Sequence, residues 1–164
     1  MKTSEFKDII EQIKSTSVPR RMVYIWQGRL CDLDGFFKNL EVHRIDIALL
    51  ESKDSLTEEE TTRRIERYLV NMIRRYESKR NEPSIMVIAN AILLARYNCE
   101  LTALLKYGIS PRSLVVLVFP KATSASIPNR AERWIKNDTV ALVEKIGRQL
   151  GDSHCIIDDQ GDKE

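Results

Sequence analysis

Four short apolar runs alternate along the chain with segments that have the spacing of amphipathic helices. The runs are Met22–Trp26, Val42–Leu50, Ile85–Leu94 and Leu114–Phe119. A strand followed by a helix, repeated several times, is typical of a parallel sheet that is covered by helices. We therefore expect an α/β fold with three layers, in which a mostly parallel sheet of four to five strands is flanked by helices.

The first two helices are predicted from apolar residues at helical spacing. Phe6, Ile9, Ile10 and Ile13 recur at i, i+3, i+4 and i+7, which indicates an amphipathic helix near the start of the sequence. After the first strand, Gln27-Gly28-Arg29 is the expected exit turn, and Asp32 is the expected cap of a short helix. The apolar face of that helix is Leu33, Phe36, Phe37 and Leu40.

The longest helix is predicted to begin at a capping box, with Thr57 as the cap and Glu60 three residues later. Its apolar residues keep a 3.6-residue rhythm and are Ile65, Tyr68, Leu69, Met72, Ile73 and Tyr76. Its outer face carries Arg63, Arg64, Arg67, Arg74, Arg75, Lys79 and Arg80. Pro83 follows the end of this helix.

The rest of the chain predicts three further elements. A helix over 100–107 ends at Gly108, which suits a left-handed cap. The polar residues 121–128 form a loop, a final helix runs from a cap at Asp138 to Gly151, and a short strand follows over 154–157. We expect residues 1–157 to form a single α/β domain and residues 158–164 to form a charged tail.

Composition places the chain among ordinary globular proteins. Of its 164 residues, 43% are hydrophobic and 30% are charged, which suffices for one hydrophobic core. The net charge of +2 does not by itself indicate a nucleic-acid partner. The longest apolar stretch, Ile85–Ala95, is too short to cross a bilayer, so we expect no membrane partner. The first residues lack a secretory signal, and we expect a cytoplasmic location.

The three cysteines do not predict a disulfide framework or a metal site. Cys31, Cys99 and Cys155 are odd in number and widely separated, as free thiols in a reducing compartment are. Together with His43 and His154 they show none of the close spacings of a zinc site. We therefore expect no metal and no cofactor.

The turn after the first strand is where a nucleotide-binding protein of this layout holds phosphate. Aligned on Gly28 with the motif G-x-x-x-x-G-K-[ST], the chain has Leu33 for the second glycine, Asp34 for the lysine and Gly35 for the hydroxyl residue. A carboxylate at the lysine position would repel phosphate. Asn90 follows the third strand, where a metal-binding carboxylate is expected. Both losses predict a P-loop-like shell that does not hydrolyse nucleotide.

A resemblance covers the third and fourth strands. The stretch over 84–120, SIMVIANAILLARYNCELTALLKYGISPRSLVVLVFP, resembles the Walker B to sensor region of the small P-loop ATPases of bacteriophage-exclusion (BREX) systems. In those proteins a hydrophobic strand is followed by a leucine-rich helix, an arginine and a last hydrophobic strand. The resemblance implies an accessory subunit of a bacterial phage-defence complex, with Arg112 at the position of a sensor-like arginine. Arg112 is alternatively a solvated residue before a strand.

A second constellation points to different chemistry. Glu51-Ser-Lys53 follows an apolar run that contains Asp46, and Asp34 lies further upstream. Nucleases of the PD-(D/E)xK type use two acids to bind a divalent metal and a lysine to orient the attacking water. Asp34 or Asp46 with Glu51 and Lys53 would supply these groups. The three-residue motif is also the ordinary composition of a solvated segment before a capped helix.

The arginine-rich face of the longest helix predicts a weak nucleic-acid site. Arg64, Arg67 and Arg75 could follow a phosphate backbone. Glutamates lie among the arginines, and i,i+4 ion pairs on a solvated helix explain much of the same pattern.

The function that the sequence favours is therefore a non-catalytic subunit that docks onto a larger protein partner, an ATPase or a DNA-modifying subunit. DNA binding and homo-oligomerisation stay open, and the alternative is the metal-dependent nuclease.

Overall fold

The computed structural model describes residues 1–15, 23–50, 57–77, 83–107, 113–119, 141, 143–151 and 154–158. Its elements in chain order are α1 (Thr3–Ser15), β1 (Val23–Gln27), α2 (Leu30–Asp34), the 3₁₀ helix η1 (Gly35–Phe37), β2 (Glu41–Asp46), the 3₁₀ helix η2 (Ile47–Leu50), α3 (Glu58–Glu77), β3 (Ser84–Ala89), α4 (Ile92–Arg96), α5 (Thr102–Tyr107), β4 (Ser113–Phe119) and β5 (His154–Asp158). Residues 143–150 are also helical and are called the last helix below.

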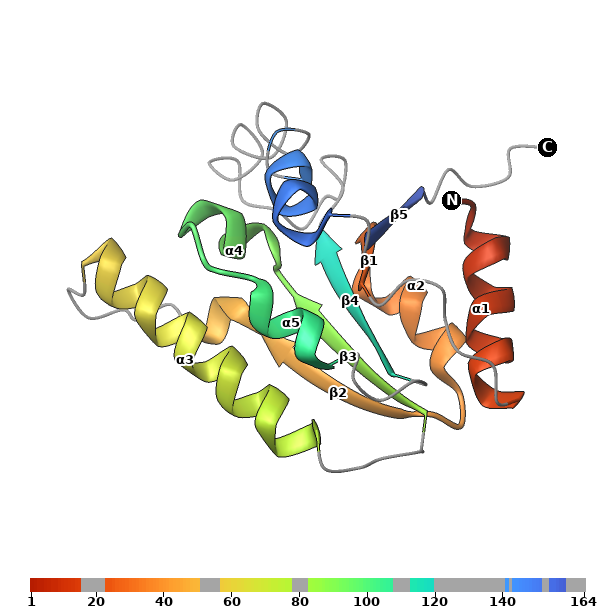
Figure 1. Ribbon diagram of the computed structural model, residues 1–164. Helices are drawn as coiled ribbons and strands as arrows, with labels where there is room; N and C mark the ends of the chain where they lie inside the picture. Colours follow the sequence, from red (N-terminus) through yellow and green to blue (C-terminus); the bar gives the residue numbers. More distant parts are fainter. Residues whose placement is uncertain are drawn as a thin grey trace.

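The five strands form one sheet in the order β2-β3-β4-β1-β5, and all four neighbouring pairs are parallel. Figure 1 shows the sheet between two groups of helices. The predicted α/β fold with a parallel, helix-flanked sheet is therefore confirmed. The central strand β4 is buried along its whole length, which explains its continuous apolar sequence.

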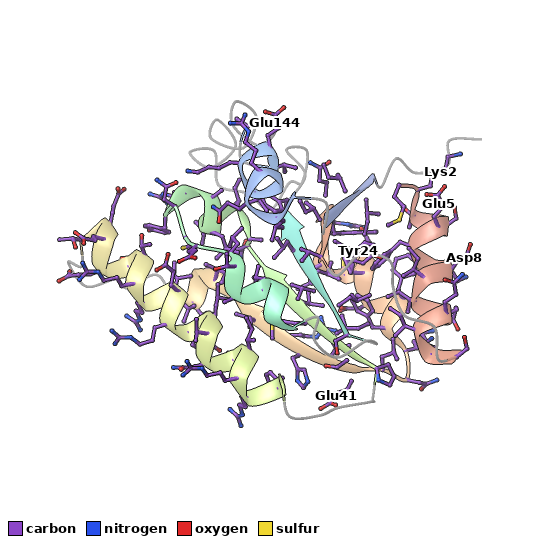
Figure 2. All side chains as sticks on the ribbon, in the orientation of Figure 1. Lys2, Glu5, Asp8, Tyr24, Glu41 and Glu144 are labelled. Carbon is purple, nitrogen blue, oxygen red and sulfur yellow. The ribbon has the colours of Figure 1, made fainter. Side chains whose placement is uncertain are left out.

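Alternate side chains of each strand pack against different helices. On β1, Tyr24 and Trp26 lie in the cluster formed with α1 and α2, whereas Val23 and Ile25 lie in the cluster formed with α3, α4, α5 and the last helix. The ring of Phe6 on α1 lies 5.2 Å from the ring of Tyr24, which Figure 2 labels between β1 and α1. The period-2 alternation of a strand thus divides the core into two layers.

The predicted helices bury the expected faces. On α1, Phe6, Ile10 and Ile13 are fully buried. The capping box is formed at the start of α3, because the Thr57 backbone N–H donates to Glu60 Oε2 (2.9 Å) and the Glu60 N–H donates to Thr57 Oγ1 (3.2 Å). The buried apolar face of α3 is Ile65, Leu69 and Ile73. Tyr68 is not part of it, because its side chain points outward and is 36% exposed.

Two predicted boundaries were wrong. The strand expected over Val42–Leu50 ends at Asp46, because the Asp46 carboxylate accepts the backbone N–H of Ala48 (2.9 Å) and the chain turns into η2. The short helix after β1 begins at Leu30 rather than after Asp32. Asp32 therefore lies within its first turn, where it pairs with Arg29.

The end of the chain agrees in part with the prediction. In the last helix Val143, Ile146 and Leu150 are buried, and Gly151 has a positive φ of 55°. The predicted last strand is present as β5 and pairs with β1. Gly108, the loop over 121–128, the cap at Asp138 and most of the tail over 158–164 lie outside the described residues.

The layered core predicts very different costs for two chemically identical substitutions. Leu117 is fully buried in β4, whereas Leu49 is 79% exposed. We expect Leu117→Ala to lower the free energy of unfolding by about 2–5 kcal/mol, through lost burial and a residual cavity. Leu49→Ala should change it by less than about 0.5 kcal/mol. Urea denaturation of both variants checks this, and equal losses would contradict the burial described here.

Candidate functional site

The turn after β1 contains only Gly28 and Arg29, because β1 ends at Gln27 and α2 begins at Leu30. Gly28 is buried, and its N–H donates to the Phe119 carbonyl at the end of β4 (3.0 Å). The Trp26 Nε1–H donates to the Arg29 carbonyl (3.2 Å). A phosphate loop places four residues between its first glycine and the glycine–lysine pair, so that several N–H groups face the ligand. The two-residue turn has no such cradle.

Asp34 does not lie in this turn. It is the last residue of α2, and its Oδ1 accepts a hydrogen bond from Arg44 Nη1 of β2 (2.7 Å). Both side chains are about half exposed, so the ion pair contributes little stability. The alignment that put Asp34 in the place of a phosphate-binding lysine is therefore wrong, because a helix separates Asp34 from the strand end.

The carboxyl ends of β2 and β3 bring two sequence candidates together. Asn90 follows β3, and its Nδ2 donates to Asp46 Oδ1 at the end of β2 (2.8 Å). Asn90 has a φ of 53°, a left-handed conformation that asparagine adopts more easily than most residues. Next to it, the Ala91 N–H donates to the Val118 carbonyl (3.1 Å), which ties the exit of β3 to β4. Asp46 and Asn90 are both half-buried in this arrangement.

This edge of the sheet is the usual place for ligands in open parallel sheets. Asp46 Oδ1 already accepts hydrogen bonds from Asn90 and from the Ala48 N–H. Among the residues that the structure describes, no group of three or more His, Cys, Asp or Glu side chains could hold a metal ion. In the described part of this edge, Asp46 and Asn90 therefore bond to one another and stabilise the backbone at the ends of β2 and β3.

The structure describes only some of the residues of the predicted nuclease site. Glu51 and Lys53 lie outside the described residues, as does Arg112. Asp46 and Glu51 are separated by η2, so Glu51 follows a 3₁₀ helix and not a strand end as the motif expects. Asp34 is paired with Arg44 and belongs to α2. The structure thus brings Asp46 together with Asn90.

The outer face of α3 forms a hollow of about 550 Å³ against η2. Its lining residues are Leu50, Glu60, Arg63, Arg64, Arg67, Tyr68 and Asn71. Arg64 and Arg67 from the predicted nucleic-acid face are thus brought to one site. Arg75 lies further along the helix, over the ring of Tyr76 (6.0 Å). The sequence pattern missed Tyr68, because its helical spacing suggested a core position.

Ion pairs explain less of the arginine pattern than the sequence suggested. Within the described residues one arginine–glutamate pair forms on α3, between Arg63 and Glu59. Glu60 belongs to the capping box, and Glu66 Oε1 accepts the Glu100 N–H ahead of α5 (2.7 Å). These acids therefore bond to backbone N–H groups near the starts of helices, and within the described residues neither forms an ion pair with Arg64 or Arg67.

The described cysteines and His43 do not form a common site. Cys31 is exposed on α2, whereas Cys99 is buried on the opposite side of the sheet. Burial, with a smaller contribution from Glu66, raises the pKa of the Cys99 thiol from 9.0 to about 12, so it stays protonated at neutral pH. The ring of His43 stacks on Tyr76 with centroids 3.5 Å apart. The side chains of His154 and Cys155 lie outside the described residues.

No protein-family model and no curated protein matches this chain. None of the helices in the described ranges is long and apolar enough to span a bilayer. The site must therefore be interpreted from its own geometry.

The conformation of Asn90 gives a test of the sheet edge. Asn90→Ala removes the hydrogen bond to Asp46 and places a Cβ-bearing residue without polar compensation at a φ of 53°. We expect it to lower the free energy of unfolding by about 2 kcal/mol. Asn90→Gly loses the same hydrogen bond but adopts positive φ without strain, so it should cost about half as much. Denaturation of both variants measures the difference; a glycine variant less stable than the alanine variant would contradict the strain argument.

Proposed function

We propose that this protein is a non-catalytic α/β subunit with a P-loop-like layout, which acts by docking onto a larger partner in a bacterial multiprotein complex. The resemblance of residues 84–120 to BREX ATPases supports an antiphage-defence complex, with an ATPase or DNA-modifying subunit as the partner. The observation that carries the proposal is the closed, two-residue turn after β1, in which the Gly28 N–H is bonded to Phe119.

The order of the strands places β4 between β1 and β3. In this chain a two-residue turn follows β1, where a P-loop ATPase has its phosphate loop. Asn90 follows β3, where such an ATPase has a carboxylate. A sheet that keeps the layout of an ATPase but lacks the phosphate loop and the carboxylate is what we expect of a subunit that is derived from an ATPase and kept for docking.

Nucleotide binding tests the proposal directly. We expect isothermal titration of the protein with ATP and Mg²⁺ to show no binding with a Kd below about 1 mM, because the described turn after β1 has neither a backbone cradle nor a lysine to compensate the phosphate charge. Gly28→Ala serves as the matched variant and should give the same flat titration. Binding in the micromolar range with release of phosphate would overturn the non-catalytic assignment.

A DNA-cleavage assay distinguishes the proposed function from the alternative, a metal-dependent nuclease. We expect no cleavage of single-stranded or duplex DNA with Mg²⁺ or Mn²⁺, because Asp34 is held by Arg44 and β2 ends before Glu51. Gel analysis after incubation with each metal checks this. Cleavage that disappears in both Glu51→Ala and Lys53→Ala, while Asp34→Asn stays active, would establish a nuclease built around Asp46.

A further inference from the structure

Two large apolar side chains of the described residues are left exposed, Tyr68 at 36% and Leu49 at 79%. Tyr68 lines the hollow on α3, and Leu50 of η2 forms its other side. Leu49 is the neighbour of Leu50 in the chain but does not line the hollow. α3 and η2 lie next to one another. We call this hollow, with its arginines, the α3–η2 hollow.

The rim of the α3–η2 hollow is positively charged. Arg63, Arg64 and Arg67 line it, and all three are exposed. Arg63 is paired with Glu59, whereas no ion pair to Arg64 or Arg67 forms within the described residues. The acid in the lining, Glu60, has one carboxylate oxygen bonded to the Thr57 N–H. Two guanidinium groups beside an apolar floor therefore remain available to anionic groups from outside.

We propose that the α3–η2 hollow binds a protein segment in which acidic residues flank a large apolar side chain. This inference rests on the proposed docking function and names the surface and the chemistry of the partner. Tyrosine and arginine are enriched in the residues that dominate protein interfaces, and an apolar centre with a polar rim is the usual anatomy. Carboxylates match the planar guanidinium groups of Arg64 and Arg67, while Leu50 and Tyr68 contact the apolar side chain.

The apolar floor distinguishes this partner from a nucleic acid. Phosphate contacts use positive charge and have no need of apolar groups such as Leu50 beside the arginines. A single-strand platform needs several aromatic rings in a row, and among the described residues Tyr68 is the one aromatic residue that lines the hollow.

Selection from a random peptide library provides the test. Immobilised wild-type protein is exposed to displayed 16-residue peptides and the pools are counter-selected on the double variant R64E/R67E. We expect the enriched peptides to contain two or more acidic residues around a leucine, phenylalanine or tryptophan. A synthetic peptide with that consensus should bind wild-type protein, and R64E/R67E should weaken it more than tenfold in fluorescence anisotropy.

Matched variants show whether the loss is specific. R74E/R75E makes the same charge change on α3 outside the lining of the hollow and should weaken binding less than threefold. Tyr68→Ala should weaken binding about tenfold without a change of charge. Circular dichroism and thermal unfolding confirm that each variant is folded, as expected because the four arginines and Tyr68 are exposed.

Four results would overturn the inference. They are the absence of any enrichment over R64E/R67E, an enriched consensus without acids, tighter binding of a 20-base-pair DNA duplex through the same arginines, or a homodimer in sedimentation that Tyr68→Ala dissociates. Binding of ATP leaves this outcome untouched, because the turn that the nucleotide titration tests lies at the end of β1 and not in the hollow. The nucleotide titration therefore tests the proposed function, and the peptide experiments separately test the partner of the α3–η2 hollow.

Discussion

The hydrogen bond from the buried Gly28 N–H to the Phe119 carbonyl fixes how the chain leaves the middle of the sheet. It extends the pairing of β1 with β4 by one residue and leaves Arg29 as the single residue before α2. A buried backbone donor is costly to leave without a partner, so opening this turn around a phosphate would require a replacement for the bond. A parallel, helix-flanked sheet is thus present with a closed turn at the end of β1.

Hydrogen bonds that involve the backbone also determine where the neighbouring strands β2 and β3 end. Asp46 ends β2 by accepting the Ala48 N–H, and it holds Asn90 in a left-handed conformation at the exit of β3. The Ala91 N–H then reaches the Val118 carbonyl. Asp46 and Asn90 are residue types that often occur in catalytic sites, but here their side chains stabilise the ends of β2 and β3. The proposed docking surface is instead the outer face of α3, where arginines and Tyr68 lie beside Leu50 of η2.

The strands and the faces of the long helices could be predicted because they follow from local periodicity. Thr57 and Glu60 were identified as a capping box from their spacing alone, and Phe6, Ile10 and Ile13 from their helical repeat. The order of parallel strands depends on contacts between distant segments, such as β1 with β4 and β5, and no local pattern contains it.

The wrong predictions at the candidate site also arose where a local sequence pattern did not determine the structure. Ile47–Leu50 is apolar enough for a strand, but the side chain of Asp46 turns the backbone into a 3₁₀ helix. Asp34 was aligned by counting from Gly28, which presumed a loop where α2 begins after two residues. Tyr68 fits a core spacing, yet it lies at the margin of the buried stripe of α3 and points outward.

The amide of Gly28 reports most directly on the central claim. Its hydrogen exchange and its chemical shift can be followed by ¹⁵N-resolved NMR with and without a non-hydrolysable ATP analogue and Mg²⁺. If the turn is closed on Phe119, this amide exchanges slowly and its resonance does not move when nucleotide is added. Rapid exchange of the free protein, or a saturable shift of the Gly28 resonance with nucleotide, would contradict the account.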